Sequence, residues 1–257
     1  MFYSAESCKA MRKDVAIWSD RARRLGSDVT SLHLENVAAR EMAQHAVGRR
    51  LSDLQHFIQR LYEVLPPDAE KPSREARLDA TAFLQSFVVN IFGVIDNFAW
   101  IWVIETDVRQ SNGDKLPASW IGLRSKQTAV RRTLSDSTQH YLSKLDPWFI
   151  YLEDFRHHLA HRIPLYIPPF VIDEADVDEV KAFQDNAFAS GWTLDRWLAV
   201  MHFMEQKGVF APYMAHSIEG GRVPFHAQMI CDLGAAVELG ERIIGELRER
   251  AELSICK

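Results

Sequence analysis

The chain has 257 residues, of which 47% are hydrophobic and 25% are charged. This length and apolar content allow the burial of a substantial core, which excludes a mainly disordered protein and fits one large domain. The formal net charge of −5 excludes a protein that coats nucleic acid through general basicity, so any nucleic-acid contact has to come from a local patch.

The cysteines and the N-terminal residues indicate the compartment. Cys8, Cys231 and Cys256 lack the paired spacing that a zinc site or a disulfide framework requires. The first residues carry early charges and contain no apolar run that ends in a small-residue cleavage site, unlike a secretory signal. We therefore expect a cytoplasmic protein in a reducing environment.

Helical periodicity dominates the first part of the chain. Residues 6–25 predict a short helix with one polar face. Residues 32–65 predict a longer helix, with a break at Gly48, that ends before Pro66. The prolines and charges of residues 66–73 then predict a loop.

Residues 74–109 predict the central helix. Its apolar run from Phe83 to Ile104 is long enough to cross a membrane, but Asp96 and other polar residues interrupt it. A charged residue at mid-membrane costs about 2.5 to 3.5 kcal/mol on insertion scales. We therefore interpret this run as a buried core helix and expect no membrane association.

The next segments contain a short helix and then a longer one. Residues 124–134 predict the short helix. Asp146 and Pro147 predict the start of the longer helix, with Asp146 as its N-cap and Pro147 in its first turn. Because Pro164 cannot continue a helix, this one should end near Arg162.

The last third of the chain mixes extended and helical patterns. Residues 165–172 are predicted to be extended, and residues 173–189 and 193–206 predict two amphipathic helices. Two short extended runs around a Glu-Gly-Gly turn predict a small β-hairpin near 210–226. Residues 228–252 predict a closing helix, so the expected fold class is an all-α helical bundle with this one hairpin.

The most unusual stretch is the Arg/His cluster, Arg156-His157-His158-Leu159-Ala160-His161-Arg162, at the predicted end of a helix, where the helix dipole favours cations. Residues four apart share a helix face, which extends the cluster into two polar stripes. The stripes are Glu153, His157 and His161, and Asp154, His158 and Arg162.

These residue types suit phosphodiester cleavage. An Arg can clamp a phosphate and stabilise charge that builds on its oxygens, while a His with a pKa near neutrality can take or give a proton. In RNA the 2′-hydroxyl can itself be the nucleophile, so neither a metal nor a cofactor is required.

The run Arg156-His157-His158-Leu159-Ala160-His161 resembles the motif of the HEPN superfamily (higher eukaryotes and prokaryotes nucleotide-binding helical domain). That motif is an Arg, a polar residue, three further residues and a His. The resemblance implies a helical bundle and, in active members, a metal-independent endoribonuclease of toxin or defence type that pairs two motifs across a homodimer cleft. It implies that Arg156 holds phosphate, that His161 is the general acid or base, and that His157 orients the site.

The resemblance also implies supporting residues and partners. A polar or acidic residue on an earlier helix often supports the site in this family. The supporting candidates are Asp96, Asn97, His158, Arg162 and Tyr166, with Glu105 as a further polar residue on the central helix. A buried Asp96 should pair with a cation, for which Arg156, His158 and Arg162 are candidates. The implied partners are RNA or a nucleotide, a second copy of the chain and a neutralising protein.

The resemblance covers only part of the expected single domain, residues 1–257. A HEPN-like core would occupy residues 74–165, after N-terminal helices in 1–73 and before a C-terminal elaboration in 166–257. The bare pattern is weakly specific, because the run from Arg40 to His45 also matches it. We interpret that second match as a chance pattern on an exposed helix face.

Two alternatives stay open at this point. Three ligands at Glu153, His157 and His161 would span about 12 Å along one helix, too far for one ion, but the two histidines with a carboxylate from another helix could hold a metal. The cluster could also be a structural ion-pair network in a noncatalytic interaction or ligand-binding protein of the same fold. The scattered histidines are predicted to be structural. They are His140, His202, His216 and His226.

Overall fold

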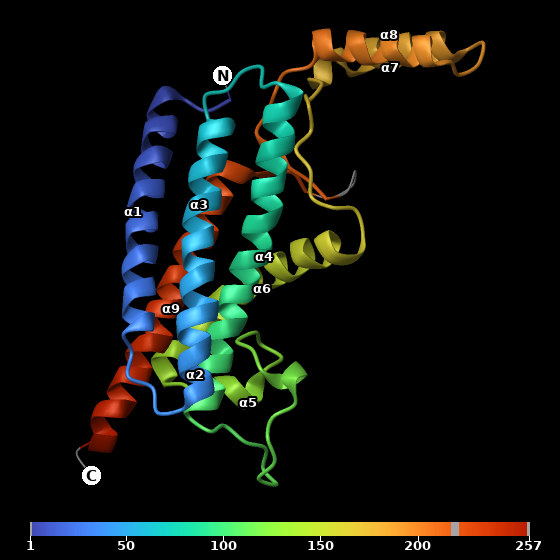
Figure 1. Cartoon of the computed structure of the whole chain (residues 1–257). Helices are drawn as coiled ribbons and strands as arrows, with labels where there is room; N and C mark the ends of the chain where they lie inside the picture. Colours follow the sequence, from blue (N-terminus) through green and yellow to red (C-terminus); the bar gives the residue numbers. More distant parts are fainter. Residues whose placement is uncertain (1, 217–220, 256–257) are drawn as a thin grey trace.

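The computed structural model describes residues 2–216 and 221–255. Four long helices run side by side: α1(Ala5–Thr30), α3(Gly48–Val64), α4(Arg74–Glu105) and α9(Phe225–Ile255) (Figure 1). They form a ring in which α1 packs on α3, α3 on α4, α4 on α9, and α9 on α1. The predicted all-α helical bundle is thus confirmed, and it draws its helices from both ends of the chain.

Helix α4 supplies much of the bundle core. Its side chains Leu84, Phe87, Ile91, Val94 and Phe98 are fully buried. By length and composition α4 is the one described helix that could cross a membrane, and 56% of its most apolar stretch is buried within the protein. Because α3 and α9 pack on it, the bundle itself removes part of this apolar surface from water.

The helices before α4 differ from the prediction at their ends. Helix α1 continues past the expected stop to Thr30, because Leu25 and Val29 are buried in the core and this packing outweighs the helix cost of a glycine. The second predicted helix is divided into α2(Val37–Glu41), a π-helical segment η1(Met42–Val47) and α3, so the expected break falls just before Gly48.

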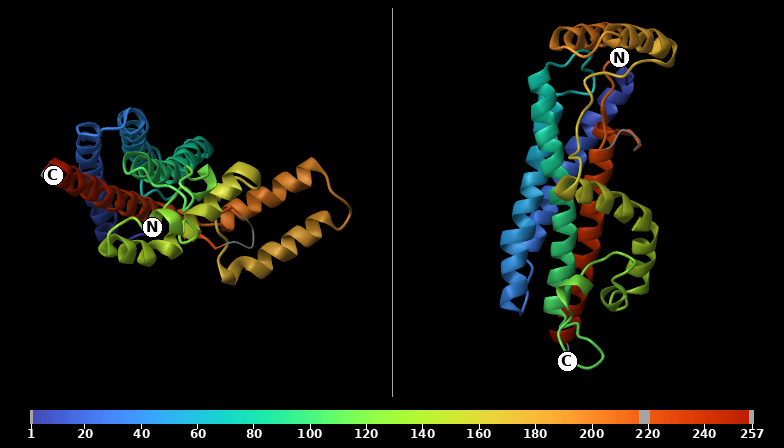
Figure 2. Two further views of the ribbon diagram at one scale, coloured as in Figure 1. Left: turned by 90° about the horizontal axis from the view of Figure 1, so that it is seen from below. Right: turned by 90° about the vertical axis from the view of Figure 1, so that its right-hand side faces the viewer.

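Helix α6(Asp136–His161) begins ten residues before the predicted start at Asp146, which is a correction. The Ser135 side chain caps it by accepting a hydrogen bond from the Thr138 N–H at 3.3 Å. Pro147 therefore lies inside the helix, where a proline removes one backbone hydrogen bond and favours a bend. Figure 2 shows α6 curving away from the bundle axis. Its end at His161 agrees with the prediction.

The region between α4 and α6 is mainly loop. It contains a short 3-10 helix, η2(Ala118–Trp120), and one turn of helix, α5(Thr128–Arg131), within the segment predicted to be helical. The Arg131 guanidinium donates hydrogen bonds to both carboxylate oxygens of Asp146. Asp146 is thus an ion-pair partner that holds α5 against α6, and not a helix cap.

Helices α7(Glu174–Phe188) and α8(Leu194–Lys207) form an arm that projects from one end of the bundle (Figures 1 and 2). Val180 and Val200 are buried between the two helices, and the rings of Phe183 and Phe203 stack with centroids 4.2 Å apart. This confirms the predicted pair of amphipathic helices. Several large apolar side chains of the arm stay exposed, among them Trp192, Leu194, Trp197 and Leu198.

The predicted hairpin is present as two short antiparallel strands, β1(Tyr213–Met214) and β2(Val223–Pro224). In its register Tyr213 is opposite Pro224 and Met214 is opposite Val223. The predicted turn residues Glu219 and Gly220 lie outside the described residues. The extended segment after α6 runs beside the hairpin, because Tyr166 and Ala215 exchange backbone hydrogen bonds of 2.9 and 3.0 Å.

Candidate functional site

Helix α6 turns an apolar face toward the bundle and leaves the Arg/His cluster at its outer end. Phe149, Leu152 and Phe155 are buried, so these positions fix which way the helix faces. After the helix ends, the Gln85 side-chain amide on α4 donates to the Leu165 carbonyl at 2.6 Å. Packing and this hydrogen bond therefore anchor both sides of the cluster to α4.

Arg156, His157 and His161 are exposed at this end of α6. Within the described part of the chain, their side chains form no hydrogen bond or ion pair. The two imidazole rings contact each other, and the guanidinium contacts an aromatic ring. The imidazole centroids of His157 and His161 are 5.3 Å apart, and the Arg156 guanidinium lies 5.0 Å from the centre of the Phe92 ring. Their polar atoms thus remain available to a ligand.

Cations predominate around Arg156. The Arg124 guanidinium also lies over the Phe92 ring, at 5.1 Å, so one aromatic side chain on α4 supports two positive charges. Glu153 accepts a hydrogen bond from Lys126 at 2.6 Å and lies 3.5 Å from Arg124. The Lys126 hydrogen bond is the main reason that the pKa of Glu153 is lowered, so this carboxylate stays charged and engaged. Among the described residues, the group of side chains that could hold a metal does not include Glu153.

Asp96 does not form the expected ion pair, which is a correction. Among the described residues no cationic nitrogen lies within 4.0 Å of its carboxylate. Burial raises the pKa of Asp96, while Arg124 and Arg156 lower it from a longer distance. The half-buried carboxyl therefore has no direct ion pair. The surrounding positive charge stabilises its ionised form, and burial increases its tendency to hold a proton.

The remaining supporting candidates on α4 serve other contacts. Asn97 accepts a hydrogen bond from Arg50 Nε at 3.0 Å, and Arg50 also donates to Asn90 at 2.8 Å, which ties α3 to α4. This guanidinium lies against Gly93, where a Cβ atom would be only 2.5 Å from it. The Glu105 carboxylate accepts the backbone N–H groups of two residues before α2. Among the described hydrogen bonds and ion pairs, none joins Asn97 or Glu105 to the Arg/His cluster.

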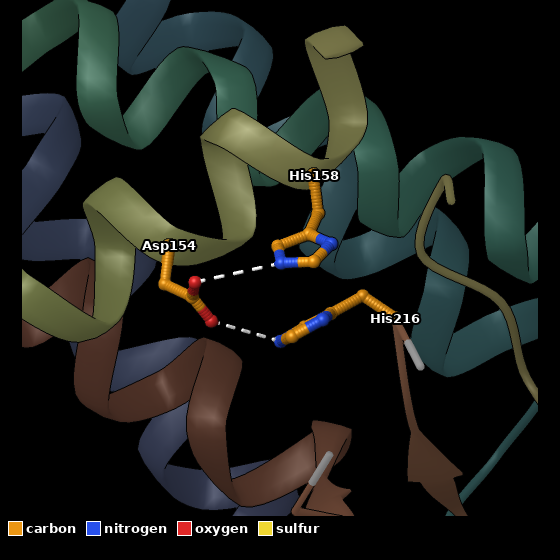
Figure 3. A group of neighbouring side chains, drawn as sticks. All are labelled: Asp154, His158 and His216. Atoms are coloured by element: carbon orange, nitrogen blue, oxygen red, sulfur yellow. Dashed lines mark ion pairs between the residues drawn. The ribbon is translucent and has the colours of Figure 1, made fainter. Parts of the chain in front are cut away.

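His158 is oriented differently from its neighbours. It belongs to a group with Asp154, one turn earlier on α6, and His216 (Figure 3). His216 Nε2 lies 3.0 Å from one oxygen of Asp154, and His158 Nε2 lies 3.6 Å from the other. The two imidazole centroids are only 4.0 Å apart. Each of the two rings thus directs its Nε2 atom at the Asp154 carboxylate.

The hairpin carries His216 to this place. The bridge between Tyr166 and Ala215 fixes the residue just before it, and the His216 ring packs edge-on against buried Phe155 at 4.6 Å. His216 is 8% exposed and was predicted to be a scattered structural histidine. No spacing in the sequence could pair it with α6, because a contact between distant segments creates the group. Tyr166, a supporting candidate, therefore acts through its backbone.

The second sequence match, from Arg40 to His45, differs from the cluster in one decisive respect. The Arg40 guanidinium donates to the Leu34 carbonyl, with distances of 2.9 and 3.3 Å from two of its nitrogens. His45 lies on η1 and is exposed. The Arg40 guanidinium is therefore already bound to the chain before α2. The Arg156 guanidinium makes no such hydrogen bond among the described residues. Arg162, the helix C-cap, is exposed as well.

No family model, curated protein or solved structure matches this chain.

Proposed function

We propose that this protein is a HEPN-like, metal-independent endoribonuclease in which Arg156 and His161 act on the RNA backbone. The observation that carries the proposal is that Arg156, His157 and His161 are all exposed, with side chains that no described hydrogen bond or ion pair engages. A structural network would instead bury these groups among carboxylates and pair them. An Arg fork and two imidazoles left free at a helix end are suited to a phosphate and a mobile proton.

The charge around the motif supports an anionic substrate. Arg124, Lys126 and Arg156 gather on one side of α6 and its neighbouring loop, where Glu153 is the carboxylate bound to two of them. A chain with net charge −5 gains local attraction for a phosphodiester from such a patch. Because Phe92 supports the Arg156 side chain, less conformational freedom is lost when Arg156 binds phosphate.

In the proposed reaction His161 removes the proton of the RNA 2′-hydroxyl. The 2′-oxygen then bonds to phosphorus, the bond from phosphorus to the 5′-oxygen breaks, and the leaving oxygen takes up a proton from an imidazolium. The products are a 2′,3′-cyclic phosphate and a 5′-hydroxyl. Arg156 stabilises the charge on the non-bridging oxygens. His157, whose ring centroid is 5.3 Å from that of His161, orients the His161 ring.

The proposal includes a homodimer that brings two motifs together. Ile150 on α6 and Ile163 just after the helix bracket the cluster, and their exposed fractions are 69% and 52%. Ile150 and His157 are seven residues apart and share the outer face of α6. Two exposed isoleucines beside a polar motif favour contact with a second copy, since association removes their apolar surface from water.

The test is cleavage of mixed single-stranded RNAs in excess EDTA by the purified full chain. We expect the wild-type protein to cleave. We expect His161→Ala to lower the rate by about 10²- to 10⁴-fold, the usual contribution of a general acid or base, and Arg156→Ala by about 10²- to 10³-fold. Because both side chains are exposed, the variants should keep the wild-type melting temperature.

His45→Ala is the matched control, because it removes the histidine of the second sequence match, also from an exposed position. It should cleave at the wild-type rate. Equal cleavage by wild type, His161→Ala and Arg156→Ala would indicate a contaminating nuclease and refute the proposal. Absence of cleavage by the wild-type protein would favour a noncatalytic interaction or ligand-binding protein of this fold.

A further inference from the structure

We propose that Asp154, His158 and His216 form a binding site for a divalent transition-metal ion of the zinc type, which joins the β-hairpin to the end of α6. The inference does not depend on the proposed ribonuclease activity, because Arg156 contacts Phe92 on α4 whereas this group faces the hairpin (Figure 3). Among the described residues it is the one set of three such side chains whose ligand atoms converge.

The positions of the ligand atoms fit a single ion. One nitrogen from each imidazole and one carboxylate oxygen all lie within 4.8 Å of one another. His216 Nε2 is 3.0 Å from one Asp154 oxygen, and His158 Nε2 is 3.6 Å from the other. Tetrahedral zinc with bonds of about 2.0 to 2.1 Å requires ligand atoms about 3.4 Å apart. A movement of less than about 1 Å by side chains that already face one point would therefore complete the coordination.

The burial of the three residues suits a site with an open position. The His216 and His158 side chains are 10% and 13% exposed, so their rings are held by packing, whereas Asp154 is 54% exposed. The metal can thus enter from the carboxylate side, and water can fill the remaining coordination positions. His158 and Asp154 are four residues apart on α6, a spacing that directs both side chains to one face.

The ligand chemistry selects the class of ion. Two imidazole nitrogens and one carboxylate oxygen favour Zn²⁺, Co²⁺ or Ni²⁺, whereas Mg²⁺ and Ca²⁺ prefer oxygen ligands throughout. The Nδ1 atoms of His158 and His216 have no hydrogen-bond partner among the described residues. Because such outer partners typically strengthen a site by about 10- to 100-fold, we expect weaker binding than at a structural zinc centre that has them.

Metal binding at this site would also strengthen the contact between α6 and the hairpin. Without a metal, two imidazoles with centroids 4.0 Å apart share one carboxylate. A divalent ion bound to all three side chains would link residues far apart in the sequence and would stabilise the folded chain, because the unfolded chain does not assemble the site.

The experiment is titration of the metal-free full chain with ZnCl₂ by calorimetry, repeated with CoCl₂ while the visible absorption of Co²⁺ is recorded. We expect one equivalent to bind, a Co²⁺ spectrum typical of four or five ligands, a higher melting temperature with Zn²⁺, and no binding of MgCl₂. Asp154→Asn and His216→Asn should each lower the Zn²⁺ affinity by more than about 100-fold, since loss of an outer partner alone costs about 10- to 100-fold.

Two controls separate this site from other histidines. His140→Asn, at an exposed position of the same helix, should bind Zn²⁺ as the wild type does. His161→Asn removes one histidine of the exposed His157/His161 pair, so that this pair can no longer bind a metal. This variant should still bind one equivalent of Zn²⁺ with the wild-type affinity. If His216→Asn fails to fold, Asp154→Asn decides, because its side chain is exposed. The proposal is overturned if wild type binds no Zn²⁺, if Asp154→Asn binds it equally, or if only His161→Asn loses it.

Discussion

Replacing Asp232 by asparagine should change how the stability of the protein depends on pH. Asp232 lies on α9, is 1% exposed, and one of its oxygens accepts hydrogen bonds from Trp148 at 2.8 Å and Gln228 at 2.7 Å. Burial raises the pKa of Asp232 to about 7 from 3.8, although the two hydrogen bonds oppose this. Between these values the folded chain keeps a proton that the unfolded chain has released, so stability falls as pH rises.

The size of the effect follows from the width of this window. Each pH unit contributes about 1.4 kcal/mol, so the free energy of unfolding should fall by at most about 4 kcal/mol between about pH 4 and pH 7. His226 acts in the opposite direction, because burial lowers its pKa from 6.5 to about 4 and stability rises with pH over that range. The two effects should nearly cancel in the wild-type protein below about pH 6.5.

The assay is urea unfolding, followed by circular dichroism, of the wild type and Asp232→Asn at several pH values from about 4.5 to 8. Asparagine keeps an oxygen that can accept both hydrogen bonds but cannot ionise. We therefore expect the stability of Asp232→Asn relative to the wild type to increase with pH up to about 7 and then to level off, because above the folded pKa the carboxyl is ionised in both states. A difference that is the same at both ends of the range would refute the reasoning, because it would mean that Asp232 ionises alike in the folded and unfolded chains.

Three further stability predictions follow from packing and charge. Asp146→Asn should destabilise the protein by about 3 kcal/mol in the same assay, because it leaves the largely buried Arg131 guanidinium without its carboxylate; a loss below about 0.5 kcal/mol would contradict this. Gly240→Ala should lower stability by about 1 to 3 kcal/mol, since its Cβ would lie 2.5 Å from Phe98 and 2.6 Å from a second core side chain. Gly245→Ala, where a Cβ meets no atom within 4 Å, should instead raise stability by about 1 kcal/mol. Equal changes in stability at both glycines would contradict the idea that the packing around each Cβ determines the effect.

The bundle was predictable wherever the apolar pattern and the breakers agreed. Helix α4 has a long apolar stretch between a proline-containing loop and a turn-rich segment, and the closing helix α9 is similarly clear. The start of α6 was not predictable from these rules. Asp146 and Pro147 look like a helix start, but Arg131 binds Asp146, and the helix tolerates Pro147 by bending. The tertiary ion pair outweighed the local signal.

The candidate site was predictable only where it lies on a single helix. The exposed Arg156, His157 and His161 follow from the helical spacing and the predicted helix end. The role of His216 does not, because its approach to Asp154 depends on the backbone pairing of two segments that are distant in the sequence. The position of Asp96 near Arg156 was expected, but the absence of a direct ion pair depends on side-chain distances that only a structure provides.

The most direct test of the central proposal compares two oligonucleotides in EDTA with the wild-type protein. One is entirely RNA, and the other carries a single 2′-deoxynucleotide at the position that is cleaved in the first. We predict a 2′,3′-cyclic phosphate and a 5′-hydroxyl from the first and no cleavage of the second at that position, because the 2′-hydroxyl is the nucleophile. Cleavage at the deoxy position, or no cleavage of either oligonucleotide, would contradict the assignment of Arg156 and His161 as a ribonuclease site.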